Sequence, residues 1–455
     1  MNSDYPKFAV VGHPNKGKSS IVAVLAMDNS VQISDTPGTT SKKRFFPLKI
    51  DGNTIYELID TPGFQRGRRV LAWLEQHEVS ADKKQQIVQK FINEHKNDPK
   101  YNDEIELLEP LMKGAGIIYV VDGSKPYGKE YEADMEILRW TGQPSMALIN
   151  HIHDSDYSQE WKRALGQYFK LVRTFNPMEV TINQHLNLLE SMAQLNEEWT
   201  SSVKVSIALF KKHHAYKMKK STQIITQLID NSLSLTIEVA FKDEIPTTQE
   251  KENLENEYRE RLRTLEKKSH QQIEKLWNHQ KIQTEKSEGL FEELDLFSES
   301  SASAFGLSKN ELVLRSALAG AGIDILSFGS TLFMGTILGA TSAYFGFDKL
   351  QEVKVLGQTL GKKYLQIGPM ENRNFPFILL SRVVYHTSEI ATFSHAKQEY
   401  KINLMEENFK NRWLRDDLKN DLGKYHQLFS AKDKKKEEDL ESYEVLINDI
   451  LSRLI

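Results

Sequence analysis

Gly12-His13-Pro14-Asn15-Lys16-Gly17-Lys18-Ser19 is the stretch that decides the fold of the first part of this chain. It fits the pattern G-x-x-x-x-G-K-[ST] at every fixed position. An apolar segment precedes it at residues 7–11 and another follows it at residues 21–27, so that a strand, a glycine-rich loop and a helix are predicted in succession. In this setting the backbone N–H groups of the loop turn inward, and the helix N-terminus adds partial positive charge. The sequence therefore predicts a site for the phosphates of a nucleotide.

Individual side chains of this loop are expected to contact the nucleotide. Lys18 is expected to reach the β- and γ-phosphates, and Ser19 is expected to ligate Mg²⁺. A glycine-rich turn without a ligand is the alternative, which the flanking strand and helix disfavour. The residues predicted to form the phosphate site are Gly12, Pro14, Asn15, Lys16, Gly17, Lys18, Ser19 and Ser20.

Two further motifs are predicted to complete the site. Asp60-Thr61-Pro62-Gly63 ends a predicted strand, where Asp60 is expected to hold Mg²⁺ through water and the Gly63 N–H to contact the γ-phosphate. The loop Asp35–Thr40 lies upstream, and Thr40 is expected to complete the Mg²⁺ shell only when a γ-phosphate is present. A polar surface turn is the alternative for this loop. The catalytic candidates are Lys18, Thr40 and Gly63, and the Mg²⁺ ligands are Ser19, Thr40 and Asp60.

The distribution of proline divides the chain into two parts. Ten of the 13 prolines lie at or before Pro177, where short apolar runs alternate with turns and amphipathic stretches. This alternation predicts an α/β domain at residues 1–182, with a mostly parallel sheet, helices on both faces and a helical insertion at about 65–113. The later part is rich in Glu, Lys, Leu and Gln, which predicts a mainly α-helical domain at residues 183–455. The predicted strands are Lys7–Val11, Arg44–Ile50, Thr54–Ile59, Gly116–Val121, Ser145–Ile149 and Phe169–Thr174.

Composition limits the classes of function. The 59 Lys and Arg residues nearly balance 63 Asp and Glu residues, so any binding of nucleic acid or anionic lipid must be local. The chain has no cysteine, which excludes disulfides and thiolate sites. Residues 1–7 lack the basic flank and apolar core of a signal peptide, so we expect a cytoplasmic protein.

The motifs GHPNKGKSS, PGTT and DTPG, at these spacings, resemble the Era, TrmE and EngA branch of the translation-factor-related GTPases over residues 5–180. Residues 119–126, 129–131, 367–369 and 374–380 also resemble a bacterial group whose C-terminal half is a domain of unknown function. The resemblance implies a P-loop GTPase that hydrolyses GTP to GDP and phosphate with slow intrinsic turnover. It further implies a nucleotide-dependent switch in which residues 30–43 and 61–72 move.

Base recognition departs from the pattern of these GTPases. They select guanine with N-K-x-D after the fifth strand, and the Asp carboxylate accepts two N–H bonds from the base. Asn150 stands at the first position, but His151 replaces the Lys, and Asp154 comes one residue late. Asp154 is a candidate guanine ligand, with a helix N-cap as the alternative. Because the motif is degenerate, an ATPase is a competing prediction.

A second departure concerns the attacking water. Phe64 stands where Ras-type enzymes place a glutamine that orients this water. Era-like enzymes share such an apolar residue, and TrmE-like members compensate with a K⁺ ion held partly by an Asn in the loop. Asn15 occupies that position, so the resemblance implies K⁺ beside Mg²⁺; a hydrogen bond that stabilises the loop is the alternative. The alternative to K⁺ is an activator, or the helical domain itself, docking on Arg66, Arg68 and Arg69.

Residues 185–300 are predicted to form long helices with an apolar stripe. A basic cluster at Lys211–Lys220 is a candidate for binding RNA or anionic lipid, with a solvated helix face as the alternative. RNA is the less favoured partner, because no GXXG loop of the KH type is present in this half.

Residues 312–347 are unusually apolar and rich in glycine. Between Arg315 and Asp348 the only charged residue is Asp324, and Ile325–Phe345 gives 21 uncharged residues, enough to cross a bilayer. Three alternatives remain open: a buried hairpin, a hairpin that enters or leans on a membrane, and a single span. The membrane alternatives predict a nucleotide-driven scaffold or remodelling protein, peripheral at the inner face of the membrane.

Overall fold

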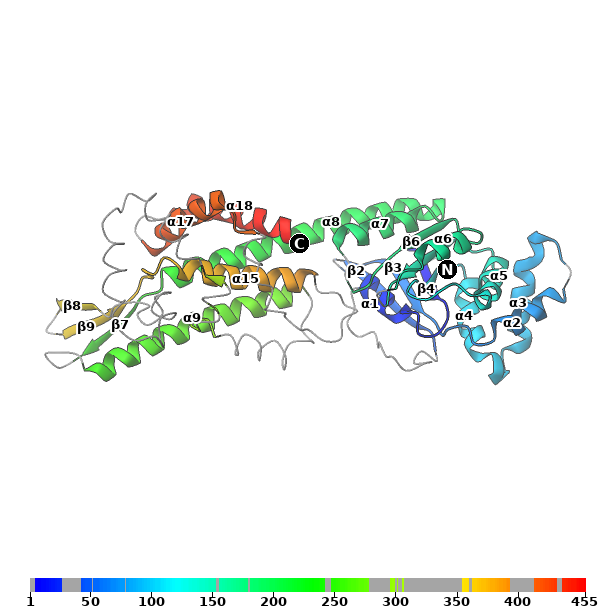
Figure 1. Ribbon diagram of the computed structural model, residues 1–455, viewed down its shortest axis with the longest axis horizontal. Coiled ribbons are helices and arrows are strands. Elements are labelled where there is room, and N and C mark those ends of the chain that lie inside the picture. Colours follow the sequence, from blue (N-terminus) through cyan, green and yellow to red (C-terminus); the bar gives the residue numbers. More distant parts are fainter. Residues whose placement is uncertain are drawn as a thin grey trace. The chain divides into compact units, whose positions relative to one another are not determined.

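The computed structural model describes residues 5–26, 42–50, 52–77, 79–152, 155–178, 181–241, 247–277, 295–298, 301, 305–306, 354–359, 362–392, 413–431 and 436–455 (Figure 1). The chain divides into two compact units. The first unit comprises residues 1–214 and 392–398, and the second comprises 215–391 and 399–455. The boundary that the sequence predicts at 182/183 falls at the start of helix α7 (Ile182–Ala193) and stays a prediction.

A six-stranded sheet forms the centre of the first unit. Its strand order is β2-β3-β1-β4-β5-β6, and every pairing is parallel except that of β2 with β3. All residues of β4 are buried, as expected for a central parallel strand covered on both faces. Because β1, β3 and β5 run parallel, the loops after them leave the sheet at the same edge, where open α/β sheets bind ligands. The strands are β1 (Lys7–Val11), β2 (Arg44–Ile50), β3 (Asn53–Asp60), β4 (Gly116–Asp122), β5 (Ser145–Asn150) and β6 (Leu171–Thr174).

Helices cover both faces of this sheet, which confirms the predicted α/β fold. Successive residues of a strand point to opposite faces, and in β1 Phe8 and Val10 enter one apolar cluster while Ala9 and Val11 enter another. The first cluster includes α1 (Lys18–Ala26), α7 and the beginning of α8 (Glu197–Leu233). The second includes α2 (Gly67–Glu75), α3 (Lys84–His95), α4 (Asn102–Met112), α5 (Glu132–Trp140) and α6 (Ser158–Leu165). Short 3₁₀ turns precede three of these helices: η1 (Ala81–Lys83), η2 (Pro99–Tyr101) and η3 (Lys129–Tyr131).

Two predicted elements begin at a residue that differs from the structure by two or more positions. Helix α1 begins at Lys18 and not at Ile21, because the Ile21 N–H already donates to the Gly17 carbonyl at 3.0 Å. Strand β6 begins at Leu171 and not at Phe169. The Phe169 N–H donates to the Leu165 carbonyl at 2.9 Å, so this residue closes the end of α6.

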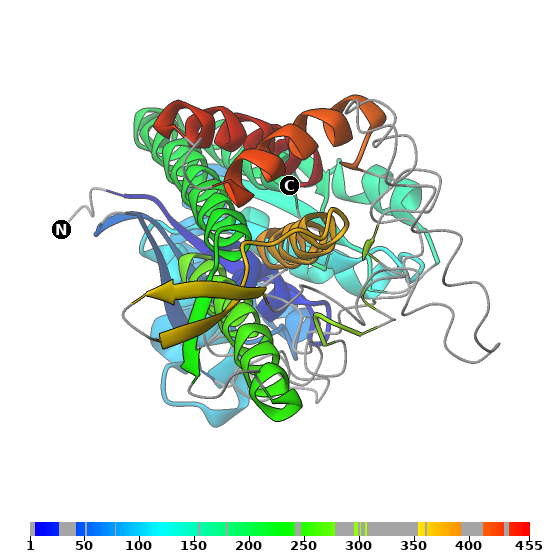
Figure 2. The ribbon, with the colours of Figure 1, turned by 90° about the vertical axis from the view of Figure 1, so that its left-hand side faces the viewer.

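The second unit is mainly helical, as predicted, but it also contains a three-stranded antiparallel sheet of order β7-β9-β8. Figure 2 shows β8 and β9 in yellow beside the green strand β7. The prediction of helices throughout residues 185–300 is wrong at β7, because its pairing partner β9 lies far along the chain and local pattern does not reveal it. The elements are β7 (Ile237–Phe241), α9 (Thr248–Leu276), β8 (Lys354–Thr359), β9 (Lys362–Ile367), α15 (Phe375–Thr392), α17 (Asp416–Ser430) and α18 (Glu437–Leu454).

The apolar segment 312–347 lies outside the described residues. Among the helices that the structure does describe, none combines the length and apolar character needed to cross a bilayer.

Helices α9 and α15 are joined by buried polar side chains. Arg382 of α15 donates to both carboxylate oxygens of Glu266 on α9, at 2.6 and 3.1 Å, and is only 1% exposed. One turn later, His386 Nε2 lies 3.0 Å from Glu274 Oε1. The His270 ring stacks on His386 with centroids 4.1 Å apart. Burial, then the neighbouring His386 and Arg382, lower the pKa of His270 well below its usual value.

Removing one partner of the buried Arg382–Glu266 pair leaves a carboxylate uncompensated in the core. We expect Arg382→Met to reduce the free energy of unfolding by about 3–5 kcal/mol. The control is Arg261→Met, whose Glu257 partner is 45% exposed, and which should change stability by less than about 1 kcal/mol. Urea unfolding followed by circular dichroism measures both. Equal stability of the two variants would contradict a structural role for the buried pair.

Candidate nucleotide-binding site

Lys18 lies beneath the loop that joins β1 to α1, with its side chain buried. Its ammonium Nζ donates to the carbonyl oxygens of His13 at 2.9 Å and Gly12 at 3.2 Å. Burial lowers the pKa of Lys18 to about 8, while the carboxylates of Asp60 and Asp134 act in the opposite direction. A buried cation is disfavoured unless an anion compensates it. The position of Lys18 therefore favours an anionic ligand.

The loop that follows β3 meets this loop at the same edge of the sheet. The Ser19 hydroxyl donates to Asp60 Oδ2 at 3.2 Å, although 41 residues separate them in the chain. Asp60 is buried, and its neighbour Thr61 donates through Oγ1 to the Val10 carbonyl at 2.7 Å. Hydroxyl and carboxylate oxygens are the ligands that Mg²⁺ prefers, so this pair fits the ion. Thr40, the third predicted ligand, lies outside the described residues.

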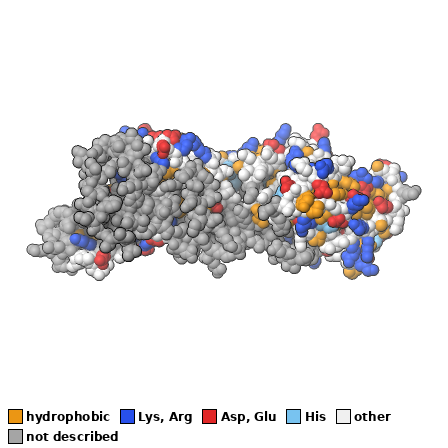
Figure 3. All heavy atoms as spheres, viewed as in Figure 1, with side chains coloured by type: hydrophobic (Ala, Val, Ile, Leu, Met, Phe, Trp, Pro, Cys, Tyr) orange, Lys and Arg blue, Asp and Glu red, His pale blue; other side chains and the backbone are white. Residues whose placement is uncertain are grey.

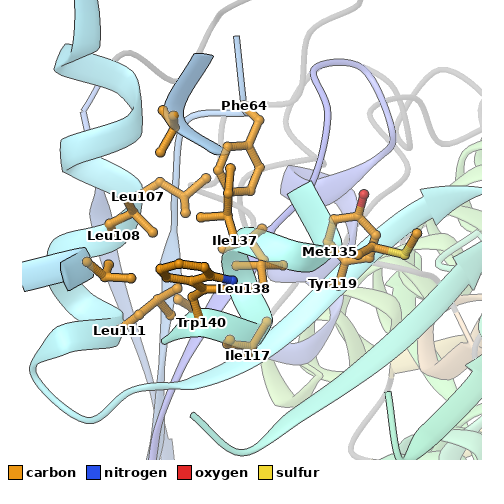
Figure 4. Close-up of a cluster of buried hydrophobic side chains, with 14 of the residues drawn as sticks. Phe64, Leu107, Leu108, Leu111, Ile117, Tyr119, Met135, Ile137, Leu138 and Trp140 are labelled. Atoms are coloured by element: carbon orange, nitrogen blue, oxygen red, sulfur yellow. The ribbon is translucent and has the colours of Figure 1, made fainter. Parts of the chain in front are cut away.

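Gly63 packs directly against the loop that contains Lys18. A Cβ atom at this position would lie 2.6 Å from the Pro14 nitrogen and 2.9 Å from the Gly12 carbonyl oxygen, so that only glycine fits. The next residue, Phe64, is buried in the apolar cluster between the sheet and helices α2–α6. Figure 4 shows its ring beside the side chains of that cluster. Phe64 is therefore a packing residue in this structure.

Asn150, the last residue of β5, reaches the loop from the other side. Its Nδ2 donates to the Lys16 carbonyl at 3.1 Å. A Cβ at Gly17, where φ is +77°, would lie 2.1 Å from that nitrogen, so a side chain there would displace Asn150. Oδ1 of Asn150 is buried and makes no hydrogen bond to any residue that the structure describes.

The other predicted base-recognition residue cannot be placed, because Asp154 lies outside the described residues. His151 does have a defined setting: its Nε2 lies 2.7 Å from the hydroxyl of Ser158, the first residue of α6. The histidine that replaces the usual lysine thus contacts the start of the following helix.

The remaining residues of the loop differ in what they present to a ligand. The Lys16 ammonium lies 3.8 Å from Asp122 Oδ2 and over the Tyr131 ring, so its side chain is directed to the end of β4. Asn15 is exposed and adopts a positive φ of 57°, which asparagine tolerates better than most residues. Ser20 is buried in the first turn of α1.

Sequence reasoning missed two acidic residues beside the site. His13 Nε2 lies 2.9 Å from Asp134 Oδ2 on α5, and burial raises the pKa of Asp134 despite this histidine. Glu104 on α4 is fully buried and accepts hydrogen bonds from the backbone just after Phe64. In the sequence both are ordinary acidic residues of amphipathic helices, so no local pattern marks them.

A pocket of about 630 Å³ opens beside His13 and Phe64. Its lining includes the side chains of Arg66, Arg68 and Arg69, which the sequence predicts as a docking surface, together with Asp103, Glu130 and Asp134. Acidic and basic side chains are also intermixed on the face of the first unit drawn in Figure 3.

Comparison with known proteins agrees with this geometry. Residues 7–151 match the family of the 50S ribosome-binding GTPase. Residues 162–452, more than half of the chain, match the Domain of unknown function DUF3482. The chain belongs to the DUF3482 family. Its first unit is a P-loop GTPase domain, which confirms the prediction from the loop and the DTPG motif.

Individual relatives cover only part of the DUF3482 protein. GTPase Der of Mycoplasma pneumoniae is 26% identical over 209 residues, which are 44% of this chain and 40% of that protein. GTPase Der of Nitrosospira multiformis is 41% identical over 76 residues, 17% of this chain and 16% of that protein. The chain thus spans less than half the length of these relatives. The crystal structure of an Aquifex aeolicus Era variant bound to GDP and AlF4⁻ is 14% identical, with a TM-score of 0.28 over 60% of this chain and 90% of that one.

Lys18→Ala should abolish nucleotide binding without unfolding the DUF3482 protein, because it removes a charge that is expected to face the phosphates and contributes no apolar packing. Since the pKa of Lys18 is lowered to about 8 in the fold, the buried charge disfavours folding below pH 8, and this penalty disappears as pH rises toward 10.5. The nucleotide-free wild type should therefore gain stability relative to the variant over that range. Fluorescent-nucleotide titration and thermal unfolding measure the two effects, with Lys90→Ala as an exposed control. Wild-type affinity in Lys18→Ala would remove the phosphate-site assignment.

Proposed function

We propose that this DUF3482 protein binds GTP, hydrolyses it to GDP and phosphate, and acts as a nucleotide-dependent switch. The observation that carries the proposal is the meeting of two loops at one edge of the sheet. Lys18 and Ser19 begin α1, whereas Asp60 ends β3 and Gly63 follows it, in contact with the same loop. An ammonium, a hydroxyl, a carboxylate and a backbone N–H are thereby brought together. These groups position and neutralise a transferring phosphoryl group.

Mg²⁺ and the γ-phosphate would connect the site to the switch. Ser19 and Asp60 would hold Mg²⁺, with Thr40 as the ligand from the loop 35–40. When bound, the ion neutralises negative charge on the phosphates. Because Thr40 would join the ligand set only with a γ-phosphate present, the GTP and GDP states would differ at this loop.

We base the preference for guanine on the end of β5. Asn150 bonds to the phosphate loop, so the base-contacting loop that follows it starts from a fixed point. Asp154 would accept two N–H bonds from the guanine edge, whereas adenine presents no such pair of donors. ATP is therefore the competitor that the experiment must include.

Binding and competition test the proposal directly. A fluorescent GTP analogue should bind in the presence of Mg²⁺ and be displaced by GTP but not by ATP. Thr40→Ala should weaken binding of a non-hydrolysable GTP analogue about tenfold and that of GDP less than about twofold. Ser19→Ala should weaken both. The exposed Ser80→Ala is the control. Equal competition by ATP would contradict the guanine assignment, and equal losses for both nucleotides would remove the switch role of Thr40.

The potassium dependence implied by Asn15 gives a separate prediction. Phe64 is buried and cannot align water, so another group must supply that contribution. We expect replacement of KCl by NaCl at equal ionic strength to lower turnover roughly tenfold or more. Asn15→Gly should remove this difference, since glycine adopts the positive φ of residue 15 without strain and lacks the amide.

The salt comparison separates K⁺ from an activator. Equal, low rates in both salts would contradict the role of K⁺ and would favour a protein that docks on Arg66, Arg68 and Arg69. Fast turnover of the isolated protein in NaCl would contradict both explanations. Phosphate release under single-turnover conditions measures the rate.

A further inference from the structure

We propose that helix α4 of the insertion is a positioning element that holds both nucleotide-sensitive segments of the GTPase domain, and that Glu104 positions Gly63 through the backbone of residues 65 and 66. The inference rests on the proposed function, because Gly63 matters only if its N–H contacts a phosphate. It extends that function by assigning a role to an insertion between β3 and β4.

Glu104 holds the backbone that follows the DTPG motif. Its Oε1 accepts hydrogen bonds from the Arg66 N–H at 2.6 Å and the Gln65 N–H at 3.1 Å. Its side chain is fully buried, although Gln65 and Arg66 are themselves exposed. A carboxylate that accepts two N–H bonds forms charge-assisted hydrogen bonds, which are stronger than neutral ones. The two amides are thereby fixed at the start of α2, where the helix leaves N–H groups without internal partners.

The residues between this anchor and the phosphate site are also fixed. Gly63 lies against Pro14 with no room for a Cβ. Phe64 is 2% exposed and belongs to the same apolar cluster as Leu107 and Leu108 of α4 (Figure 4). Residues 63 to 66 therefore connect the phosphate loop to α4 through three consecutive contacts: backbone packing, a buried ring and two hydrogen bonds.

The same helix also holds the residue that precedes β2. The Lys43 ammonium lies 2.7 Å from Glu109 Oε2 and 3.2 Å from Glu106 Oε2, and the Lys43 N–H donates to Glu106 Oε2 at 3.2 Å. Burial alone would lower the pKa of Lys43, but the hydrogen bonds to Glu109 and Glu106 raise it. Lys43 in turn lowers the pKa of Glu109. Lys43 follows Thr40 by three residues in the sequence, so α4 contacts the chain close to the proposed switch loop.

Glu104, which contacts residues 65 and 66, lies on a different side of α4 from the two glutamates that contact Lys43. Glu106 and Glu109 are three residues apart and share one helix face, whereas Glu104 is two residues before Glu106 and points elsewhere. Leu107, Leu108 and Leu111 follow Glu104 by three, four and seven residues, so they share its face of the helix. All three are fully buried and anchor the helix. A helix held in this way moves as a unit, so a displacement of Lys43 would also displace the backbone of residues 65 and 66.

The first test separates positioning from general stability. Glu104→Leu replaces the carboxylate with an apolar side chain of similar size and so removes the acceptor, whereas Glu104→Gln keeps an acceptor oxygen. We expect Glu104→Leu to lower the single-turnover rate of GTP hydrolysis about tenfold or more, with GDP affinity within about twofold of wild type. Glu104→Gln should restore most of the rate. The control Glu94→Gln removes the same charge from an exposed residue of the insertion.

Backbone hydrogen exchange gives a readout that does not depend on activity. In the GDP-bound protein, the amides of residues 65 and 66 should exchange slowly in wild type and Glu104→Gln, and faster in Glu104→Leu. Unchanged exchange and unchanged turnover in a folded Glu104→Leu protein would overturn the inference while leaving the proposed function intact. Absence of GTP binding by the wild type would instead overturn the proposed function. If Glu104→Leu does not fold, Glu104→Asp, which shortens the side chain by one methylene, takes its place with the same expectations.

A double-mutant cycle tests the coupling. Lys43→Met breaks the contact on the other face of α4. The ratio of affinities for a non-hydrolysable GTP analogue and GDP should change in each single variant. If α4 couples the two segments, the double variant should change this ratio by no more than the single variant with the larger effect. Additive changes would show that the two contacts act independently and would overturn the coupling.

Discussion

The buried ammonium of Lys18 constrains how the loops at one edge of the first sheet are arranged. Lys18 must keep a charge in a place that water does not reach, and it does so by donating to the carbonyls of Gly12 and His13 close to the carboxylate of Asp60. This is possible because β1 and β3 are parallel neighbours, so that the loops after them leave the sheet at the same edge. The completely buried strand β4 pairs with β1 on its other side.

The insertion between β3 and β4 determines the surroundings of the residue that follows the D-x-x-G motif. In a chain with a water-orienting glutamine after the D-x-x-G motif, that side chain faces the phosphates. Here Phe64 turns into the apolar cluster, and Glu104 fixes the backbone on its far side. An apolar residue at this position therefore has a packing reason. In the proposed function, an ion or a partner would supply the contribution that this residue does not make.

The second unit is stabilised in a different way. Helix α15 is buried along most of its length, yet Arg382 and His386, one turn apart, face Glu266 and Glu274 on α9. The buried Arg382–Glu266 ion pair and the His386–Glu274 contact favour one register of the two helices, at the expense of desolvation.

The sequence by itself determined the nucleotide loop, the DTPG motif and five of the six strands of the first sheet to within a residue at either end, because these are local patterns with fixed spacing. It also indicated a mainly helical second part. Only the tertiary structure decided which acidic residues hold the loops, since Glu104 and Asp134 look like any other solvated residue of an amphipathic helix until α4 and α5 are folded against the sheet. The same holds for the sheet β7-β9-β8 and for the Arg382–Glu266 pair. Their partners are more than a hundred residues apart, and the period of a single helix or strand contains no information about a contact at that separation.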